Sequence, residues 1–188
     1  MFIVNSPVIE TKQVHENIFI QKIQSPEIAE KVKPGQFLNI RVTETTFPLL
    51  RRPFSVCDVE GENIFLMFNI LGEGTKILAL KHPGEMVDIL GPLGNGFNLD
   101  GEYETAIIVA GGLGAAPFPF VTRKIKNKKN ILTFIGGRTQ QDVITYGLEN
   151  CNLSSDDGSV GFKGNVVQSL EQHLDKIDIS ISKVFACG

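Results

Sequence analysis

The chain has 188 residues, 42% of them hydrophobic and 21% charged, which is the composition of a globular protein with a substantial core. Its net charge of −3 gives no basic stripe of the kind that a nucleic-acid partner requires. No apolar run reaches the roughly 18 residues of a transmembrane helix, and the N-terminus lacks a signal-peptide pattern, so we expect no membrane partner and a cytoplasmic location. Cys57, Cys151 and Cys187 lack C-x-x-C spacing, which predicts neither a disulfide framework nor a metal site.

The first hundred residues read as short strands with period-two alternation of apolar side chains. In residues 35–42, for example, Leu38, Ile40 and Val42 fall on one face, as expected for a half-buried strand. Turn signals separate the strands and a short helix is expected near residues 74–81, a pattern typical of a small antiparallel barrel or sandwich. The six predicted strands span residues 1–10, 15–23, 35–42, 52–59, 63–70 and 85–90.

The pattern changes after a glycine- and asparagine-rich stretch at residues 91–101, which we interpret as a domain junction. Short apolar runs then alternate with helical segments, as in a parallel sheet built from βαβ units. We therefore predict one domain at residues 1–98 and an α/β domain at residues 99–188. The expected strands of the second domain are 105–110, 131–135, 151–155 and 183–186, and its expected helices are 115–126, 140–148 and 165–174.

The segment Gly111-Gly112-Leu113-Gly114 connects the first of these strands to a helix. Glycines at this place let the backbone approach a pyrophosphate, while the N–H groups of the following helix favour negative charge. The match to the dinucleotide fingerprint is incomplete, because Pro117 takes the place of the third glycine and no acidic residue follows about 20 positions on. A tight turn without a ligand therefore remains an alternative.

Two further polar segments have ambiguous roles. In Arg51-Arg52-Pro53-Phe54-Ser55 the adjacent arginines form either a solvated turn or a site that holds an anion. The loop around Asp157 is rich in acidic, serine and glycine residues, a composition most often found in solvent-exposed turns.

Taken together, the motifs resemble those of the ferredoxin-NADP reductase superfamily. They occur in one order: 52–55 (RPFS), 72–75 (GEGT), 111–114 (GGLG) with Pro117, 157–159 (DGS) and 186–188 (ACG). Within the superfamily the whole chain looks most like the electron transfer subunits of dihydroorotate dehydrogenase B (PyrK-type). The resemblance implies a six-stranded antiparallel Greek-key β-barrel that binds FAD, followed by a Rossmann-like parallel α/β domain that binds NAD(H).

The resemblance also implies roles for individual residues. Arg52 would bind the FAD pyrophosphate, the backbone of Pro53, Phe54 and Ser55 would line the isoalloxazine, and Ser55 and Cys187 would lie at the reacting edges. The remaining implied FAD residues are Ile70, Gly72, Gly74 and Thr75. The implied nicotinamide-nucleotide residues are Gly111, Gly112, Gly114, Pro117, Arg138, Asp142 and Asp157.

The family further implies electron transfer from NADH through FAD and a [2Fe–2S] cluster to the FMN of a catalytic dihydroorotate dehydrogenase (PyrD-type) subunit, in a heterotetramer with two copies of each. The thiolates of that cluster lie in a C-terminal segment beyond the position of Gly188, so we expect a sequence truncated before the last strand of the sheet. Alternatives are the reductase subunit of a sulfhydrogenase, a ferredoxin:NADP transhydrogenase or an oxygenase, or a partner-binding module without catalysis.

Overall fold

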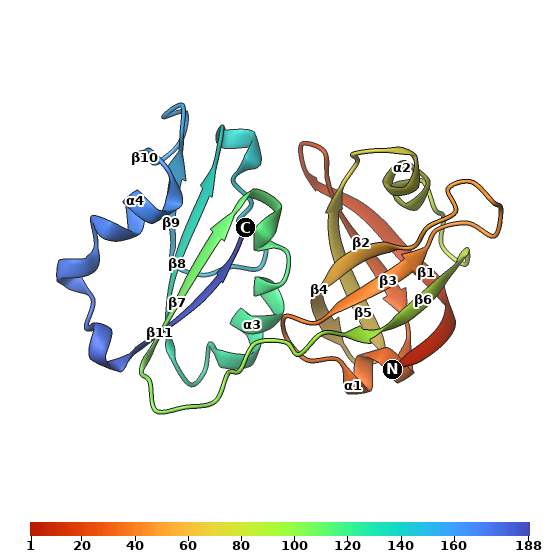
Figure 1. Cartoon of the computed structure of the whole chain (residues 1–188), viewed down its shortest axis with the longest axis horizontal. Coiled ribbons are helices and arrows are strands. Elements are labelled where there is room, and N and C mark those ends of the chain that lie inside the picture. Colours follow the sequence, from red (N-terminus) through yellow and green to blue (C-terminus); the bar gives the residue numbers. More distant parts are fainter. The chain divides into compact units, whose positions relative to one another are not determined.

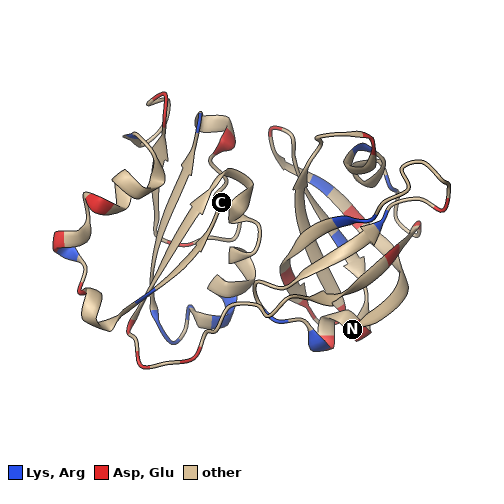
Figure 2. Cartoon of the chain, in the orientation of Figure 1, with Lys and Arg blue, Asp and Glu red and all other residues tan.

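A computed structural model describes all residues of the chain, 1–188, and divides them into two compact units. The first unit, Met1–Phe97, is called the barrel unit below, and the second, Asn98–Gly188, is called the α/β unit (Figure 1). Acidic and basic residues are interspersed over both units (Figure 2). None of the helices is long and apolar enough to cross a membrane.

The barrel unit is a closed antiparallel barrel with the strand order β1-β2-β5-β4-β3-β6. Because β2 pairs with β5 and β3 with β6, long connections as well as hairpins join the strands, as in a Greek key. The predicted antiparallel barrel is therefore confirmed. Its strands are β1 (Phe2–His15), β2 (Ile18–Gln24), β3 (Phe37–Arg41), β4 (Arg52–Glu60), β5 (Asn63–Asn69) and β6 (Met86–Leu93).

One short helix closes each end of the barrel (Figure 1). The sequence predicted α2 (Glu73–Ala79) but not α1 (Pro26–Lys31), which has only six residues and begins at a proline. Ile28 of α1 and Leu78 of α2 are completely buried, and burying each of these side chains contributes about 1.5–3 kcal/mol of transfer free energy. Both helices therefore act as apolar plugs for the barrel core.

The α/β unit contains a five-stranded parallel sheet of order β10-β9-β8-β7-β11, which confirms the predicted fold class. Helix α3 (Phe118–Ile125) buries Phe118, Phe120 and Val121, and α4 (Val166–Glu171) is capped by Asn165. The strands are β7 (Thr105–Gly111), β8 (Asn130–Gly137), β9 (Cys151–Ser155), β10 (Phe162–Lys163) and β11 (Ser182–Cys187). The unit also contains single 3₁₀ turns, labelled η1 (Gly112–Ala115), η2 (Gln140–Asp142), η3 (Leu174–Lys176) and η4 (Ile179–Ile181).

The helix predicted at residues 140–148 is wrong, because only the 3₁₀ turn η2 forms there. Thr139 caps this turn, and the chain then becomes extended at Val143. Val143 and Ile144 are both buried although they are adjacent in sequence, so the segment packs in an irregular conformation. Two adjacent β-branched residues also lose side-chain freedom in a helix, which weakens the helical alternative.

Candidate functional site

Strands β4 and β5 of the closed barrel pair over only part of their length, and we call the line between them the β4–β5 seam. The two strands pair only where Val56–Glu60 runs beside Asn63–Leu66. Residues 52–55 of β4 pair with β3 instead, and residues 67–69 of β5 pair with β2. The seam therefore opens at the end of the barrel where β5 leads into α2.

Arg52 lies at this open end and packs against the first turn of α2. A Cβ atom added to Gly74 would lie 2.5 Å from the Nε atom of Arg52 and 3.0 Å from its Cζ atom, so only glycine leaves room for the guanidinium. Arg52 donates a hydrogen bond from Nη1 to the carbonyl of Leu50 and has no acidic partner. Its remaining N–H groups and the first-turn N–H groups of α2 are donors suited to an anion.

Arg51 belongs neither to a solvated turn nor to an anion site, the two roles that the sequence allowed for the adjacent arginines, because it pairs with a carboxylate of the barrel. Its Nη2 atom lies 2.8 Å from Oδ2 of Asp88, and both side chains are about three-quarters buried, with 25% and 28% of their surfaces exposed. Its Nη1 atom also donates to the carbonyls of Asn39 and Asp88. Arg51 therefore links β3 and β6 of the barrel, and Arg52 is the arginine without a carboxylate partner.

The three residues after Arg52 alternate across the barrel wall. Phe54 is 7% exposed, and its ring meets that of Phe68 edge-on at 5.6 Å in the barrel core. Pro53 is exposed and Ser55 is half-buried, because alternate residues of a strand point to opposite faces. The backbone of Phe54, and not its ring, is therefore available at the outer face.

The residues between β5 and α2 are ordered by side chains that cap the backbone. Oγ1 of Thr75 accepts hydrogen bonds from the N–H groups of Leu71 and Gly72, so this hydroxyl stabilises the start of α2. The carboxamide of Asn17 bonds both the N–H and the carbonyl of Ile70, each at 3.2 Å. Sequence analysis missed Asn17, for which the only signal is its place in a turn, where it adopts a positive φ of 54°.

The glycine-rich segments of the α/β unit meet at the carboxyl edge of the parallel sheet. Gly111 of β7 is aligned with Gly136 of β8, and Gly136 is aligned with Ser154 of β9. On the other side of β7, Cys187 of β11 is aligned with Ala110. From β7 the successive strands β8, β9 and β10 lie on one side of the sheet, whereas β11 lies on the other side of β7. The strand order therefore reverses between β7 and β11, and the crevice at their carboxyl ends is the topological switch point. Open α/β sheets bind ligands at such a point.

Gly114 is required at the switch point by a close backbone approach. A Cβ atom added there would clash with the carbonyl of Cys187 and lie 2.7 Å from the Cα atom of Gly188. Gly112 has a positive φ of 50° and begins the turn η1, and Pro117 is the N-cap of α3. The predicted GGLG and ACG motifs are therefore in direct contact, although 73 residues separate Gly114 from Cys187.

Three predicted polar residues lie in the loops at the same edge. Arg138 is 86% exposed, and its Nε atom is 3.7 Å from Oδ2 of Asp142, which also accepts hydrogen bonds from Thr139. Oδ1 of Asp157 accepts hydrogen bonds from the hydroxyl and the N–H of Ser159, and these bonds lower the pKa of Asp157. Asp157 thus stabilises its own loop.

The three cysteines are free and lie apart from one another. Burial raises the pKa of each thiol, most strongly for Cys57 in the barrel, where the charge of Asp58 adds to the effect. Cys151 begins β9, whereas Cys187 ends β11 and is exposed. A [2Fe–2S] cluster needs four cysteine thiolates, so these residues do not form a site that fits one.

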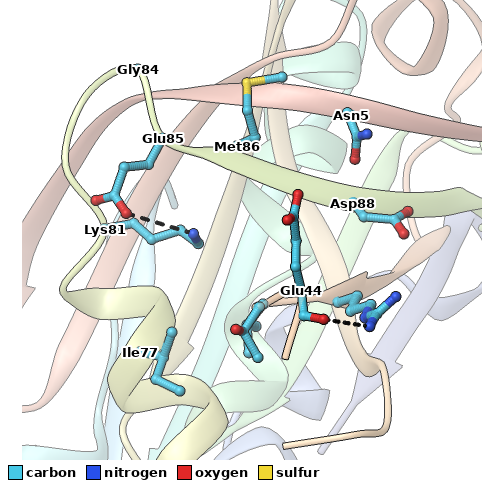
Figure 3. Close-up of a pocket in the computed structure, with 11 residues that line it drawn as sticks. Asn5, Glu44, Ile77, Lys81, Gly84, Glu85, Met86 and Asp88 are labelled. Atoms are coloured by element: carbon cyan, nitrogen blue, oxygen red, sulfur yellow. Dashed lines mark hydrogen bonds and ion pairs between the residues drawn. The ribbon is translucent and has the colours of Figure 1, made fainter. Parts of the chain in front are cut away.

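A separate pocket of about 690 Å³ lies beside α2 on the barrel surface, and Figure 3 shows its lining. Its two cations already have protein partners, because Lys81 lies 3.9 Å from the carboxylate of Glu85 and Arg41 donates to the carbonyl of Glu44. None of the residues that the sequence predicts to bind a cofactor lines this pocket. We therefore describe two candidate sites, one in each unit: the β4–β5 seam of the barrel and the carboxyl edge of the parallel sheet.

The chain is similar over almost its whole length to curated electron transfer subunits of dihydroorotate dehydrogenase B (NAD(+)). The subunit from Desulforamulus reducens is 34% identical over 192 residues, and one from Bacillus cereus is 36% identical over 193 residues. The alignments cover 98% of this chain and 72% and 73% of those relatives. A comparison with protein-family models finds no match.

Solved structures give the same assignment for the fold. An NADH-dependent reduced ferredoxin-NADP oxidoreductase superposes with a TM-score of 0.84 at 26% identity, covering 97% of this chain and 67% of that one. The ferredoxin NADP+ reductase from Neisseria gonorrhoeae, with bound FAD and NADP, superposes with a TM-score of 0.78 at 14% identity, covering 98% and 84%. These similarities confirm the resemblance carried by the ordered motifs. The chain belongs to the family of electron transfer subunits of dihydroorotate dehydrogenase B (NAD(+)), flavin oxidoreductases with a ferredoxin reductase-like fold.

Proposed function

We propose that the barrel unit binds FAD along the β4–β5 seam, with its pyrophosphate between Arg52 and the first turn of α2. The observation that carries this proposal is the packing of the Arg52 guanidinium against Gly74, which leaves donors from two elements facing one anion site. A charge-assisted hydrogen bond from a guanidinium to a phosphate is roughly twice as strong as a neutral one. Pro53, Ser55 and the side chain of Ile70 are then the contacts for the flavin ring.

We further propose that the α/β unit binds NAD(H) at the switch point. Gly111, Gly112 and Gly114 allow the backbone to approach the pyrophosphate, and Pro117 begins the helix that follows. The carboxylate of Asp142 beside Arg138 disfavours a second phosphate on the ribose, which supports NADH over NADPH. Asp157, in the adjacent loop, is the remaining candidate contact.

FAD supplies the hydride and single-electron chemistry when it is bound, and the protein supplies placement and a suitable environment. No side chain has to act as an acid or base in such a transfer. Ser55 can donate a hydrogen bond to the edge of the flavin, and the side chain of Cys187, the last residue of β11, is the contact that we propose for the nicotinamide. The partner we propose is the catalytic dihydroorotate dehydrogenase subunit, in a complex with two copies of each chain.

Anaerobic titration of the FAD-loaded protein with NADH and with NADPH, followed by the bleaching of the flavin absorption, tests this proposal. We expect NADH to reduce the flavin at lower concentrations than NADPH. In Gly114→Ala, FAD content should be preserved while the NADH concentration for half-maximal reduction rises, because the added methyl displaces the backbone of Cys187 and Gly188. A purified protein that is colourless and does not take up FAD would refute the assignment.

A further inference from the structure

The barrel encloses a carboxamide side chain that the proposed cofactor site does not explain. Gln21 of β2 is completely buried, and it lies opposite Thr11 of β1 and Leu66 of β5 in the sheet. It occupies the same strand face as Phe19 and Ile23, which belong to the apolar lining of the barrel. Burying a carboxamide is costly unless hydrogen bonds compensate, so this residue calls for a specific partner.

The carboxamide of Gln21 is held by α2 and by Thr11. Its Nε2 atom donates to the carbonyl of Leu78 at 2.8 Å and to Oγ1 of Thr11 at 2.9 Å. Because a backbone carbonyl can only accept, the bond to Leu78 fixes which end of the amide carries the nitrogen. The Thr11 hydroxyl in turn donates a hydrogen bond to the carbonyl of Lys81 at 3.4 Å, which extends this chain of hydrogen bonds.

These bonds tie the C-terminal end of α2 to the inside of the barrel. The last carbonyls of a helix have no partner within the helix, and here Gln21 supplies a donor for the carbonyl of Leu78 in the last turn, while Thr11 donates to the carbonyl of Lys81 just beyond the helix. On the outside, Lys81 lies beside Glu85, whose carboxylate also accepts from the N–H of His82 at 2.6 Å (Figure 3). The end of α2 is therefore held from both sides.

The position of α2 depends on these ties because the helix is short. It has seven residues, well below the roughly 12–15 at which an isolated helix becomes marginally stable in water. Its opposite end carries Gly74, which contacts Arg52. A shift or rotation of α2 would therefore change the distance between Arg52 and the first-turn N–H groups.

We propose that Gln21, with Thr11, is a positioning residue for cofactor binding: it fixes α2 so that its first turn and Arg52 converge on the FAD pyrophosphate. This inference rests on the proposed function of the β4–β5 seam. The hydrogen bonds of Gln21 go to Thr11 and to the last turn of α2, so its proposed effect on Arg52 is transmitted through the helix. Its Oε1 atom is buried without a hydrogen-bond partner. The desolvation of this oxygen costs free energy, which the two hydrogen bonds donated by Nε2 must offset.

The test replaces Gln21 by methionine, which keeps the length of the side chain but removes both donors. We expect Gln21→Met to weaken FAD binding by about tenfold, the effect of losing one well-placed hydrogen bond to a buried carbonyl. Riboflavin, which lacks the pyrophosphate, should bind with unchanged affinity. The ³¹P resonances of bound FAD should shift, because the pyrophosphate would sit in an altered set of donors.

Ser25→Ala is the matched control. Its hydroxyl bonds that of Ser6 at 2.9 Å, both residues are buried, and Ser25 precedes α1, at the opposite end of the barrel from α2 (Figure 1). This variant should lower the melting temperature without changing FAD affinity or the ³¹P spectrum. Thr11→Val, at a half-buried position, gives a second and milder break of the same hydrogen-bond chain, and it should weaken FAD binding in the same direction.

The outcomes separate this inference from the proposed function. If wild-type protein does not bind FAD, the proposed function fails and the inference fails with it. If wild-type protein binds FAD but Gln21→Met and Thr11→Val bind it equally well, or lose affinity for FAD and riboflavin in parallel, the positioning role is refuted and the cofactor site stands.

Discussion

Gly74→Ala is the substitution that best separates cofactor binding from folding. The added methyl would lie 2.5 Å from Nε of Arg52, so the guanidinium must move away from α2. This movement costs little in the fold, because the displaced atoms are the end of a flexible side chain. Alanine is also the better helix former, by up to about 1 kcal/mol relative to glycine in a helix interior. We therefore expect a melting temperature equal to that of the wild-type protein or slightly higher.

FAD binding should respond in the opposite direction. A hydrogen bond to a charged group contributes about 1.5–3 kcal/mol, which corresponds to a loss of roughly 10- to 150-fold in affinity if the guanidinium no longer reaches the pyrophosphate. The assay is the quenching of flavin fluorescence on titration of the FAD-stripped protein with FAD, alongside thermal unfolding of the same samples.

A double-mutant cycle with Arg52→Ala identifies the cause. If Gly74→Ala acts by displacing Arg52, it should add little in a chain that already lacks the guanidinium, because the two residues are in contact and their effects are coupled. Equal losses from Gly74→Ala in the presence and absence of Arg52 would show that the methyl blocks the ligand directly. Unchanged FAD affinity in Gly74→Ala itself would refute an anion site between these two elements.

Two further predictions concern the neighbouring structure. Arg51→Ala should lower the free energy of unfolding of the barrel by about 1–2 kcal/mol, measured by urea denaturation, because it breaks the partly buried ion pair with Asp88, while the folded fraction keeps its FAD affinity. Asp157 has a depressed pKa, so its contribution to stability is complete above the unfolded pKa of about 3.9 and is lost as the pH falls through the lower folded pKa. Ser159→Ala removes the hydroxyl donor and should raise the pKa of Asp157 toward that unfolded value, as followed by NMR titration; an unchanged pKa would contradict the assigned cause.

The sequence was most informative where a local pattern and the tertiary fold agree. Alternating strands, the glycine loop at residues 111–114 and the order of the motifs were sufficient to predict the barrel, the parallel sheet and the family. Prediction failed at residues 140–148, where the packing of Val143 and Ile144 determines the backbone, and at α1, which is too short to show a periodic pattern.

Residue types and spacing alone determined which kinds of group each candidate site contains: a guanidinium and glycines in the barrel unit, and glycines and Cys187 in the α/β unit. The role of Arg51 was decided only by the tertiary structure, because it depends on Asp88, which lies 37 positions further along the chain. The same holds for Gln21, which in sequence is one of three polar residues in its strand, with Lys22 and Gln24. The physical reason is that the partner of a charged or buried polar group is set by strand register and helix placement, and these are properties of the folded chain rather than of its local sequence.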